Sequence, residues 1–134
     1  MGSHRNARTI SPEAFPPEVL LLFDELTGEH TDVWGLAAAI ALSRFRKQNS
    51  RSPTFAEFFN EVFDLPELSA ASRVQWSTVQ SSVMHGVRYH IAVHWRRAGW
   101  ISWARTPRSL RPGEAFRQAS RNWRLGGSGS RTTR

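Results

Sequence analysis

The stretch from His85 to Arg111 is rich in arginine, histidine and tryptophan and contains no acidic residue. Its first part has apolar residues at three- and four-residue steps, the spacing of one helix face: Val87, Ile91, Trp95 and Ala98. Gly99 predicts the end of that helix, because glycine tolerates the left-handed conformation that closes helices. Residues 100–103 are aromatic and β-branched enough to predict a strand. Residues 106–113, with two prolines and a glycine, predict a turn-rich basic loop.

Gly86 decides whether this region holds one helix or two. Glycine inside a helix costs about 1 kcal/mol relative to alanine, so its presence favours a break. We therefore predict one helix that starts within residues 69–72 and ends near Met84, and a second that begins near Val87. That arrangement is a helix-turn-helix with glycine in the turn. The alternative is a single helix over residues 77–98.

The charge of the chain is divided between its two parts. Residues 1–82 carry seven basic and ten acidic side chains, a net charge of −3, whereas residues 83–134 carry eleven basic and one acidic, a net charge of +10. A field of that strength attracts a polyanion, and nucleic acid is the polyanion that we expect. Every basic residue except Lys47 is arginine, a bias that favours a GC-rich source such as an actinobacterium or one of its phages.

Three helices are predicted before the basic region. The first runs from Pro16 to Gly28, and the second begins at Thr31, which would cap it, and ends near Lys47. The third begins at Thr54, which has a glutamate three residues later in the spacing of a capping box. Its apolar face is expected to share one core with residues further along the chain: Phe55, Phe58, Phe59, Val62 and Phe63 with Trp76, Val79 and Ile91.

The chain is expected to divide into three segments. Residues 5–52 would form an N-terminal helical extension, used as core or as a dimerisation surface, which starts with a loosely held arm over residues 5–15. Residues 53–125 would form the basic domain, ending in an amphipathic helix from Glu114. The glycine- and serine-rich residues 126–134 predict a disordered tail. These expectations amount to six helices.

The segment Val87-Arg-Tyr-His-Ile91, followed by Ala98-Gly-Trp-Ile101, resembles the recognition helix and first wing strand of winged helix-turn-helix regulators. The resemblance covers residues 54–113. It implies a mainly α fold, in which a helical domain has a winged helix-turn-helix core and a short β-wing. It also implies sequence-specific binding of double-stranded DNA by a transcriptional regulator or a phage or plasmid control protein. The chain departs from the pattern in the longer spacing before Ala98 and in the lack of an evident returning strand after Trp103, so the wing is expected to be little more than a basic loop.

The helix of this motif contributes five candidates for DNA contacts. Arg88 and Tyr89, with His85 just before them, are expected at the start of the recognition helix, where arginine can pair with guanine in the major groove. Arg96 and Arg97 close the helix and are placed to meet phosphate. Basic residues are also common at helix ends for reasons of stability, so this second pair has a structural interpretation as well.

The loop contributes the other three candidates, Arg105, Arg108 and Arg111. Its prolines limit the freedom of the backbone, so the three arginines would be held semi-rigidly. Such a loop could reach into a narrow minor groove, whose negative potential attracts arginine. An exposed loop that only improves solubility is the alternative.

The tryptophans and histidines of the basic region have both structural and functional interpretations. Trp95, Trp100 and Trp103 could stack on unpaired bases, but core packing is commoner, and we expect Trp95 in the core. His90 and His94 lie four residues apart, a spacing that can bind zinc. Because no acidic or cysteine ligand lies near them in the sequence, we expect no metal.

Several classes of protein are excluded by what the sequence lacks. There is no cysteine, which excludes disulfides and thiolate chemistry. The longest apolar run, residues 19–23, is far short of a bilayer span. There is no phosphate-binding glycine loop, nucleophile elbow or pair of catalytic carboxylates, so we expect neither an enzyme nor a cofactor. The expected location is the cytoplasm, in association with the nucleoid.

Two alternatives to duplex binding stay open. The chain could be a protein-interaction module, with the N-terminal helices docked on a larger assembly and the basic half on an acidic partner. It could instead bind RNA or single strands through its tryptophans. A homodimer would suit a palindromic DNA site.

Overall fold

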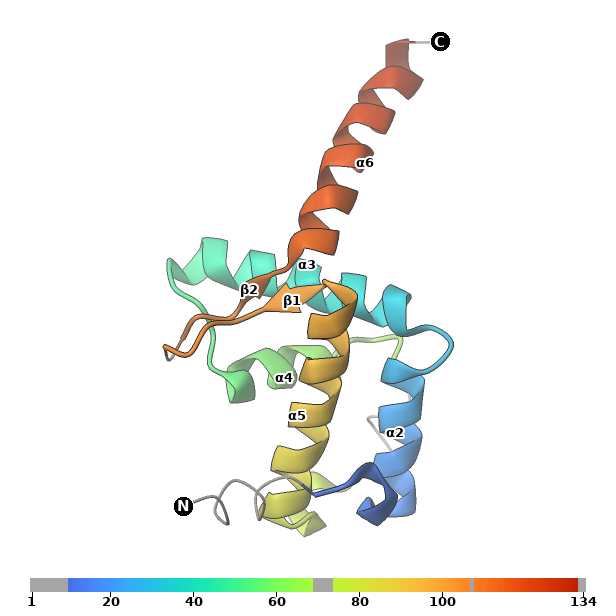
Figure 1. Cartoon of the computed structure of the whole chain (residues 1–134), viewed down its shortest axis with the longest axis vertical. Coiled ribbons are helices and arrows are strands. Elements are labelled where there is room, and N and C mark those ends of the chain that lie inside the picture. Colours follow the sequence, from blue (N-terminus) through green and yellow to red (C-terminus); the bar gives the residue numbers. More distant parts are fainter. Residues whose placement is uncertain (1–9, 69–73, 107, 133–134) are drawn as a thin grey trace.

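Five α-helices and one two-stranded sheet make up the part of the chain that the structure describes (Figure 1). The structure is a computed structural model, which describes residues 10–68, 74–106 and 108–132, with side chains up to Trp123. The α-helices are α2 (Pro17–Thr27), α3 (Thr31–Asn49), α4 (Phe55–Phe63), α5 (Ser81–Ala98) and α6 (Glu114–Thr132). The strands are β1 (Ile101–Ser102) and β2 (Arg111–Pro112), and two short 3₁₀ helices are η1 (Pro12–Ala14) and η3 (Trp76–Thr78). The chain is therefore mainly helical, as the sequence predicts, and it also contains a small antiparallel sheet.

Helix α5 is the centre of this arrangement. It packs against α2, α3, η1 and β1. Figure 1 shows α2 beside α5, α3 crossing over their upper ends, and α6 leading away from the rest of the chain. Because α5 has neighbours on several sides, most of its surface is covered, and a stripe with His85, Tyr89 and Arg96 stays exposed.

The core is aromatic and is built around Trp95, which is fully buried. The ring of Phe59 stacks on that indole with 6.3 Å between centroids, and Phe58 meets it edge-on at 6.4 Å. The indole N–H donates to the Leu26 carbonyl at 3.2 Å, so its one polar atom is satisfied. The prediction that the apolar face of α4 shares a core with Trp76, Val79 and Ile91 is confirmed, since all belong to one packed cluster.

Helix α4 begins with the capping box that the sequence predicts. The Thr54 hydroxyl accepts a hydrogen bond from the Glu57 backbone N–H at 3.1 Å, and the Glu57 carboxylate accepts one from the Thr54 N–H at 2.9 Å. Arg51 adds two hydrogen bonds of 2.9 Å to that carboxylate. The bonds from Arg51 and Thr54 lower the pKa of Glu57 to about 2. Local sequence therefore determines this helix start.

The junction between α2 and α3 matches the prediction in position but not in its capping group. Gly28 ends α2, and α3 begins at Thr31. Thr31 is not the cap, because His30 occupies the N-cap position, and the Thr31 hydroxyl is buried without a hydrogen-bond partner. Helix α3 continues to Asn49, beyond the predicted end near Lys47, and Ser50 then closes it in the left-handed conformation with φ of 56°.

The predicted helix break at Gly86 is wrong, because α5 runs without interruption from Ser81 to Ala98. Gly86 instead lies where the N-terminal segment packs on α5. A Cβ at this position would lie 3.4 Å from the Cβ of Ile10 and 3.5 Å from the Phe15 ring. This packing offsets the intrinsic helix cost of glycine. Within the described residues there are accordingly five α-helices rather than six.

The predicted helix-turn-helix with glycine in its turn is therefore absent from this part of the described chain. The predicted start of its first helix, at residues 69–72, lies outside the described residues. Its later part, residues 74–80, holds only the single 3₁₀ turn of η3. Gln80 is extended, with ψ of 147°, so the helix can start only after it.

The N-terminal arm belongs to the core from Ile10 onward, so the prediction of a loose arm is wrong for residues 10–15. Phe15 is buried and meets the Phe23 ring edge-on at 5.6 Å. His90 holds the backbone of the arm, with its Nε2 2.8 Å from the Ile10 carbonyl oxygen. The local sequence does not reveal this packing, because the contacts of the arm are with α2 and α5 rather than with its own sequence neighbours. Residues 5–9 lie outside the described range.

A returning strand exists where the sequence predicted only a loop. Ile101 pairs with Pro112 and Ser102 with Arg111, so β1 and β2 form a short antiparallel hairpin. Gly99 closes α5 in the left-handed conformation with φ of 89°, as predicted. The Gly113 N–H donates to the Trp100 carbonyl at 2.8 Å, which joins the end of the hairpin to the end of α5.

Helix α6 begins at Glu114, as predicted, but it continues through the residues expected to be a disordered tail. The structure extends it to Thr132, including the glycines at 126 and 127. The difference has a physical reason in helix cooperativity, since adding a residue to an existing helix costs much less than starting one. The glycines lower the stability of this extension, but they do not prevent it.

Candidate nucleic-acid interface

Arg88 does not lie at the start of a helix, and its side chain is only partly exposed to solvent. Because α5 begins at Ser81, Arg88 lies near the middle of the helix. It is half-buried, and its Nε is fully covered without a hydrogen-bond partner. Burial lowers the pKa of its guanidinium. The expectation that Arg88 opens a recognition helix is therefore wrong, and the reason is the missing break at Gly86.

His85 and Tyr89 are exposed on the open stripe of α5, one helical turn apart. Tyr89 retains 47% of its surface, which makes it one of the few large exposed apolar residues. Neither side chain is at a helix start, so the predicted position is corrected for these two residues as well. Their exposure nevertheless leaves them free to contact a partner.

Arg96 and Arg97 lie in the last turn of α5, as predicted, and differ in their surroundings. The Arg96 guanidinium lies 4.3 Å from the centre of the Trp103 ring and donates to the Trp103 carbonyl at 2.9 Å. This residue therefore joins the exposed stripe of α5 to the hairpin. Arg97 is exposed at the helix end.

The hairpin presents Arg105 and Arg108 from the loop between β1 and β2 and Arg111 from β2, all of them exposed. Ser109 closes the loop from inside: its hydroxyl accepts from the Ala104 N–H at 2.8 Å and donates to the Ala104 carbonyl at 3.0 Å. Leu110 is almost fully buried and ties the loop to the core. The three arginines are thus carried by a hairpin with defined internal contacts.

Arg108 has a left-handed backbone conformation, with φ of 58°, that residues other than glycine rarely adopt. Strain of this kind persists only where surrounding contacts impose it. In this loop the contacts of Ser109 and the buried Leu110 follow Arg108 directly. The loop therefore holds the Arg108 side chain outward at a cost in backbone energy.

A second group of cations, which sequence reasoning did not assign to the site, comes from the end of α3. Arg44, Arg46 and Lys47 are exposed there, and α3 packs against β2. The end of α3 and the hairpin loop lie on the same side of the molecule (Figure 1). We call these three residues together with Arg105, Arg108 and Arg111 the basic edge. A basic last turn had been visible in the sequence, but its nearness to the hairpin depends on the fold.

Acidic groups do not neutralise the basic edge. The salt bridges among described residues join Arg51 to Glu57, and Arg117 and Arg121 to Glu114. None includes a residue of the basic edge. The sequence also contains no acidic residue between Glu67 and Glu114, so the field of this surface is strongly positive.

The three tryptophans of the basic region are used in packing. Trp95 is in the core, as predicted. Trp100 lies against Gly35, where an added Cβ would come within 2.4 Å of its ring, and its N–H donates to Asp32 at 2.9 Å. Trp103 meets Phe55 edge-on at 5.2 Å. None of the three is among the exposed large hydrophobic side chains, which include a different tryptophan, Trp123, at 75% exposure.

The described residues offer neither a metal site nor a membrane span. No three histidine or acidic side chains in this part of the chain gather where they could hold a metal ion. Helices with the length and apolar character required to cross a bilayer are also missing from it. No protein-family model, characterised protein or solved structure matches this chain.

Proposed function

We propose that this chain binds double-stranded DNA through the basic edge, as a transcriptional regulator or a phage or plasmid control protein. The observation that carries the proposal is the hairpin with Arg105, Arg108 and Arg111. These are three exposed cations, two in the loop and one in β2, without an acidic partner among the described residues. Arg44, Arg46 and Lys47 extend the same charge along the end of α3.

Phosphate contacts are the chemistry that best suits the basic edge. Guanidinium groups pair with phosphate oxygens through parallel hydrogen bonds and release counterions when they do so. Two cation groups from different elements, on one side of the molecule, can follow a backbone over several phosphates. The hydrogen bonds of Ser109 restrict the conformation of the loop, so less conformational entropy is lost on binding.

Sequence preference would come from the exposed stripe of α5. His85 and Tyr89 are free there, and Arg96 connects the stripe to the hairpin through Trp103. Side chains of this kind can reach base edges in the major groove once the basic edge is anchored. Arg88 has no such part in the proposal, because its guanidinium is half-buried.

Fluorescence anisotropy with labelled duplex DNA tests the proposal. Affinity should fall steeply with salt, because each neutralised phosphate contributes about 0.9 to the slope of log affinity against log salt. The double variant Arg105→Gln with Arg108→Gln should reduce that slope by about two units. Binding that is absent, or that does not depend on salt, would contradict duplex binding.

The matched control removes two cations that already have an acidic partner. Arg117→Gln with Arg121→Gln changes the net charge equally. Both residues lie on α6 and pair with Glu114, and Arg117 also donates to the Pro112 carbonyl at 3.2 Å. The control should change the slope by less than about one unit. Equal losses from both double variants would mean that net charge alone attracts DNA. Stronger binding to single strands or to an acidic protein would favour the alternative partners instead.

A further inference from the structure

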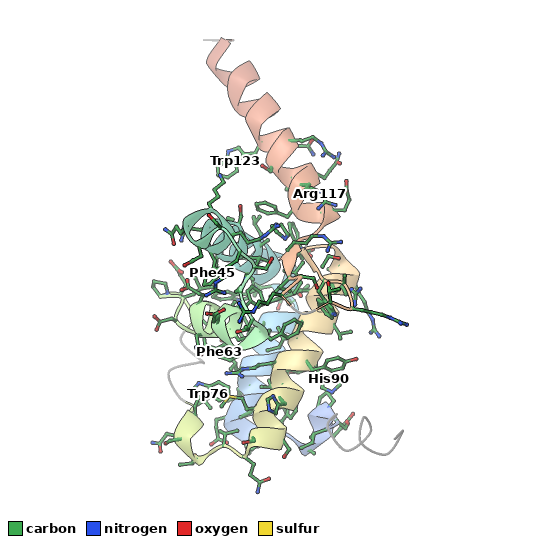
Figure 2. All side chains as sticks on the ribbon, turned by 90° about the vertical axis from the view of Figure 1, so that its left-hand side faces the viewer. Phe45, Phe63, Trp76, His90, Arg117 and Trp123 are labelled. Carbon is green, nitrogen blue, oxygen red and sulfur yellow. The ribbon has the colours of Figure 1, made fainter. Side chains whose placement is uncertain are left out.

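A pocket of about 720 Å³ lies between the end of α4, η3 and α5, away from the basic edge. Most of its wall is apolar and comprises Phe63, Leu65, Leu68, Val74, Trp76 and Met84. Phe63 and Trp76 stack almost in parallel, with 5.0 Å between centroids and 10° between planes. Figure 2 labels this pair at the lower part of the molecule. A volume of this size is typical of sites for small organic molecules.

Among the residues that the structure describes, Arg88 is the one cation that lines this pocket. Its Nε is buried, and among the described residues it is the only charged group with a covered atom that lacks a hydrogen-bond partner. A buried donor without a partner costs free energy, and the cost is larger when the group carries charge. The burial also lowers the pKa of the guanidinium, as expected where an opposite charge is lacking.

We propose that this pocket binds a small organic carboxylate, with Arg88 pairing to the carboxylate and the Phe63–Trp76 side receiving the apolar body of the ligand. The guanidinium fork matches the two oxygens of a carboxylate. One arginine balances one negative charge, whereas a phosphate ester with two negative charges would need a second cation, and the described lining contains none besides Arg88. The proposal does not depend on DNA binding, because no residue of the basic edge lines the pocket.

Asp64 is the internal competitor for Arg88. It is exposed and lines the same pocket, yet it forms no salt bridge with Arg88 in the structure. Its carboxylate therefore leaves the guanidinium available. Asn60, also exposed, is a further polar group at the pocket and can donate to a ligand oxygen.

The test compares carboxylates with their uncharged amides on the full chain. The probes are 3-phenylpropionate against 3-phenylpropanamide and hexanoate against hexanamide, measured by calorimetry and by the side-chain Nε–H resonance of Arg88. We expect each carboxylate to bind about tenfold more tightly than its amide, because a charged pair replaces a neutral hydrogen bond. The Arg88 resonance should shift with the carboxylate.

Two variants make the test specific. Arg88→Met keeps a long side chain and should abolish the preference for the acid, while Arg97→Gln, at the exposed end of the same helix, should retain it. Thermal melting without ligand verifies that both variants fold. The proposal is overturned if no carboxylate binds, if acid and amide bind equally, or if Arg88→Met retains the preference. A loss of stability in Asp64→Asn that matches that of Arg88→Met, without carboxylate binding, would show that Arg88 pairs with Asp64 and would also overturn it.

Discussion

Helix α5 and the hairpin that follows it each carry three arginines, but these arginines differ in their surroundings. In α5, Arg88 is half-buried, and of the two exposed arginines Arg96 lies against Trp103. In the hairpin, Arg105, Arg108 and Arg111 are all exposed. The difference teaches that a high density of arginine does not locate a cationic surface. The contacts of each side chain with the rest of the fold decide which cations are available to a partner.

This contrast separates two kinds of experimental effect. Changes in α5 or in the side chains packed on it should alter stability, because the helix is at the centre of the core. Changes at the loop arginines should alter affinity for a polyanion and leave stability nearly unchanged, because exposed substitutions have small effects on folding. A loop-arginine variant that lowers stability, or a variant in the core around α5 that lowers only the affinity for a polyanion, would contradict this comparison.

The largest effect is expected for Phe59→Ala. Phe59 is fully buried and stacks on Trp95 of α5, so its truncation should cost about 3–5 kcal/mol of unfolding free energy in a denaturant titration. Phe55→Ala is the control, since Phe55 is only partly buried and should cost less. A loss below about 1 kcal/mol for Phe59→Ala would show that the α4 face is not packed on α5.

The next prediction distinguishes an arginine that contacts phosphate from an arginine that recognises a base. Arg108→Gln should weaken binding to all duplex sequences alike and lower the salt slope by about one unit, because a loop arginine meets phosphate. Arg88→Gln should leave the preferred sequence unchanged, because its guanidinium is half-buried on α5. Selection from randomised duplexes with each variant measures both. An Arg88 variant that changes the selected motif at one position would assign base reading to α5 after all.

A smaller effect, a gain in stability rather than a loss, is expected for Gly86→Ala. Alanine stabilises a helix interior by about 0.8–1.0 kcal/mol over glycine, and a Cβ at this position meets Ile10 at an ordinary contact distance of 3.4 Å. The variant should therefore melt at a higher temperature than the parent. Gly86→Leu serves as the contrast, because the larger side chain must displace the arm and should destabilise. Destabilisation by alanine would mean that the arm packs more closely than these distances indicate.

The smallest effect is expected at the end of α6. Removal of residues 126–134 should leave the melting temperature unchanged, because this part of α6 leads away from the body (Figure 1). The deletion also removes Arg131 and Arg134, so a slight loss of nonspecific DNA affinity is expected. A clear drop in melting temperature would show that the end of α6 is docked on the core.

Sequence reasoning was reliable where neighbouring residues determine the structure. The end of α2 at Gly28, the capping box of Thr54 with Glu57 and the left-handed end of α5 at Gly99 were all predicted at the right residues. Each of these signals acts within one helical turn. The core position of Trp95 was also predictable, because its spacing with Ile91 follows one helix face.

Where contacts join distant residues, the sequence was insufficient. Gly86 is compatible with a helix because Ile10 and Phe15 pack on it, and nothing in the local pattern reveals that contact. The same limitation applies to the site. The exposure of Arg108 could be predicted from its loop, whereas the half-buried state of Arg88 depends on the pocket between α4 and α5. The position of the end of α3 on the same side of the molecule as the hairpin likewise required the fold.

The root of α6 has a mechanical consequence. Its first turn is clamped to the end of α5, since Ala115 N–H donates to the Gly99 carbonyl at 2.8 Å and an added Cβ at Gly113 would lie 2.3 Å from that same oxygen. The end of α5, the end of the hairpin and the start of α6 therefore meet at one hydrogen-bonded junction. A partner that pulls on the far end of α6 would apply its force to α5 and to the hairpin through this junction.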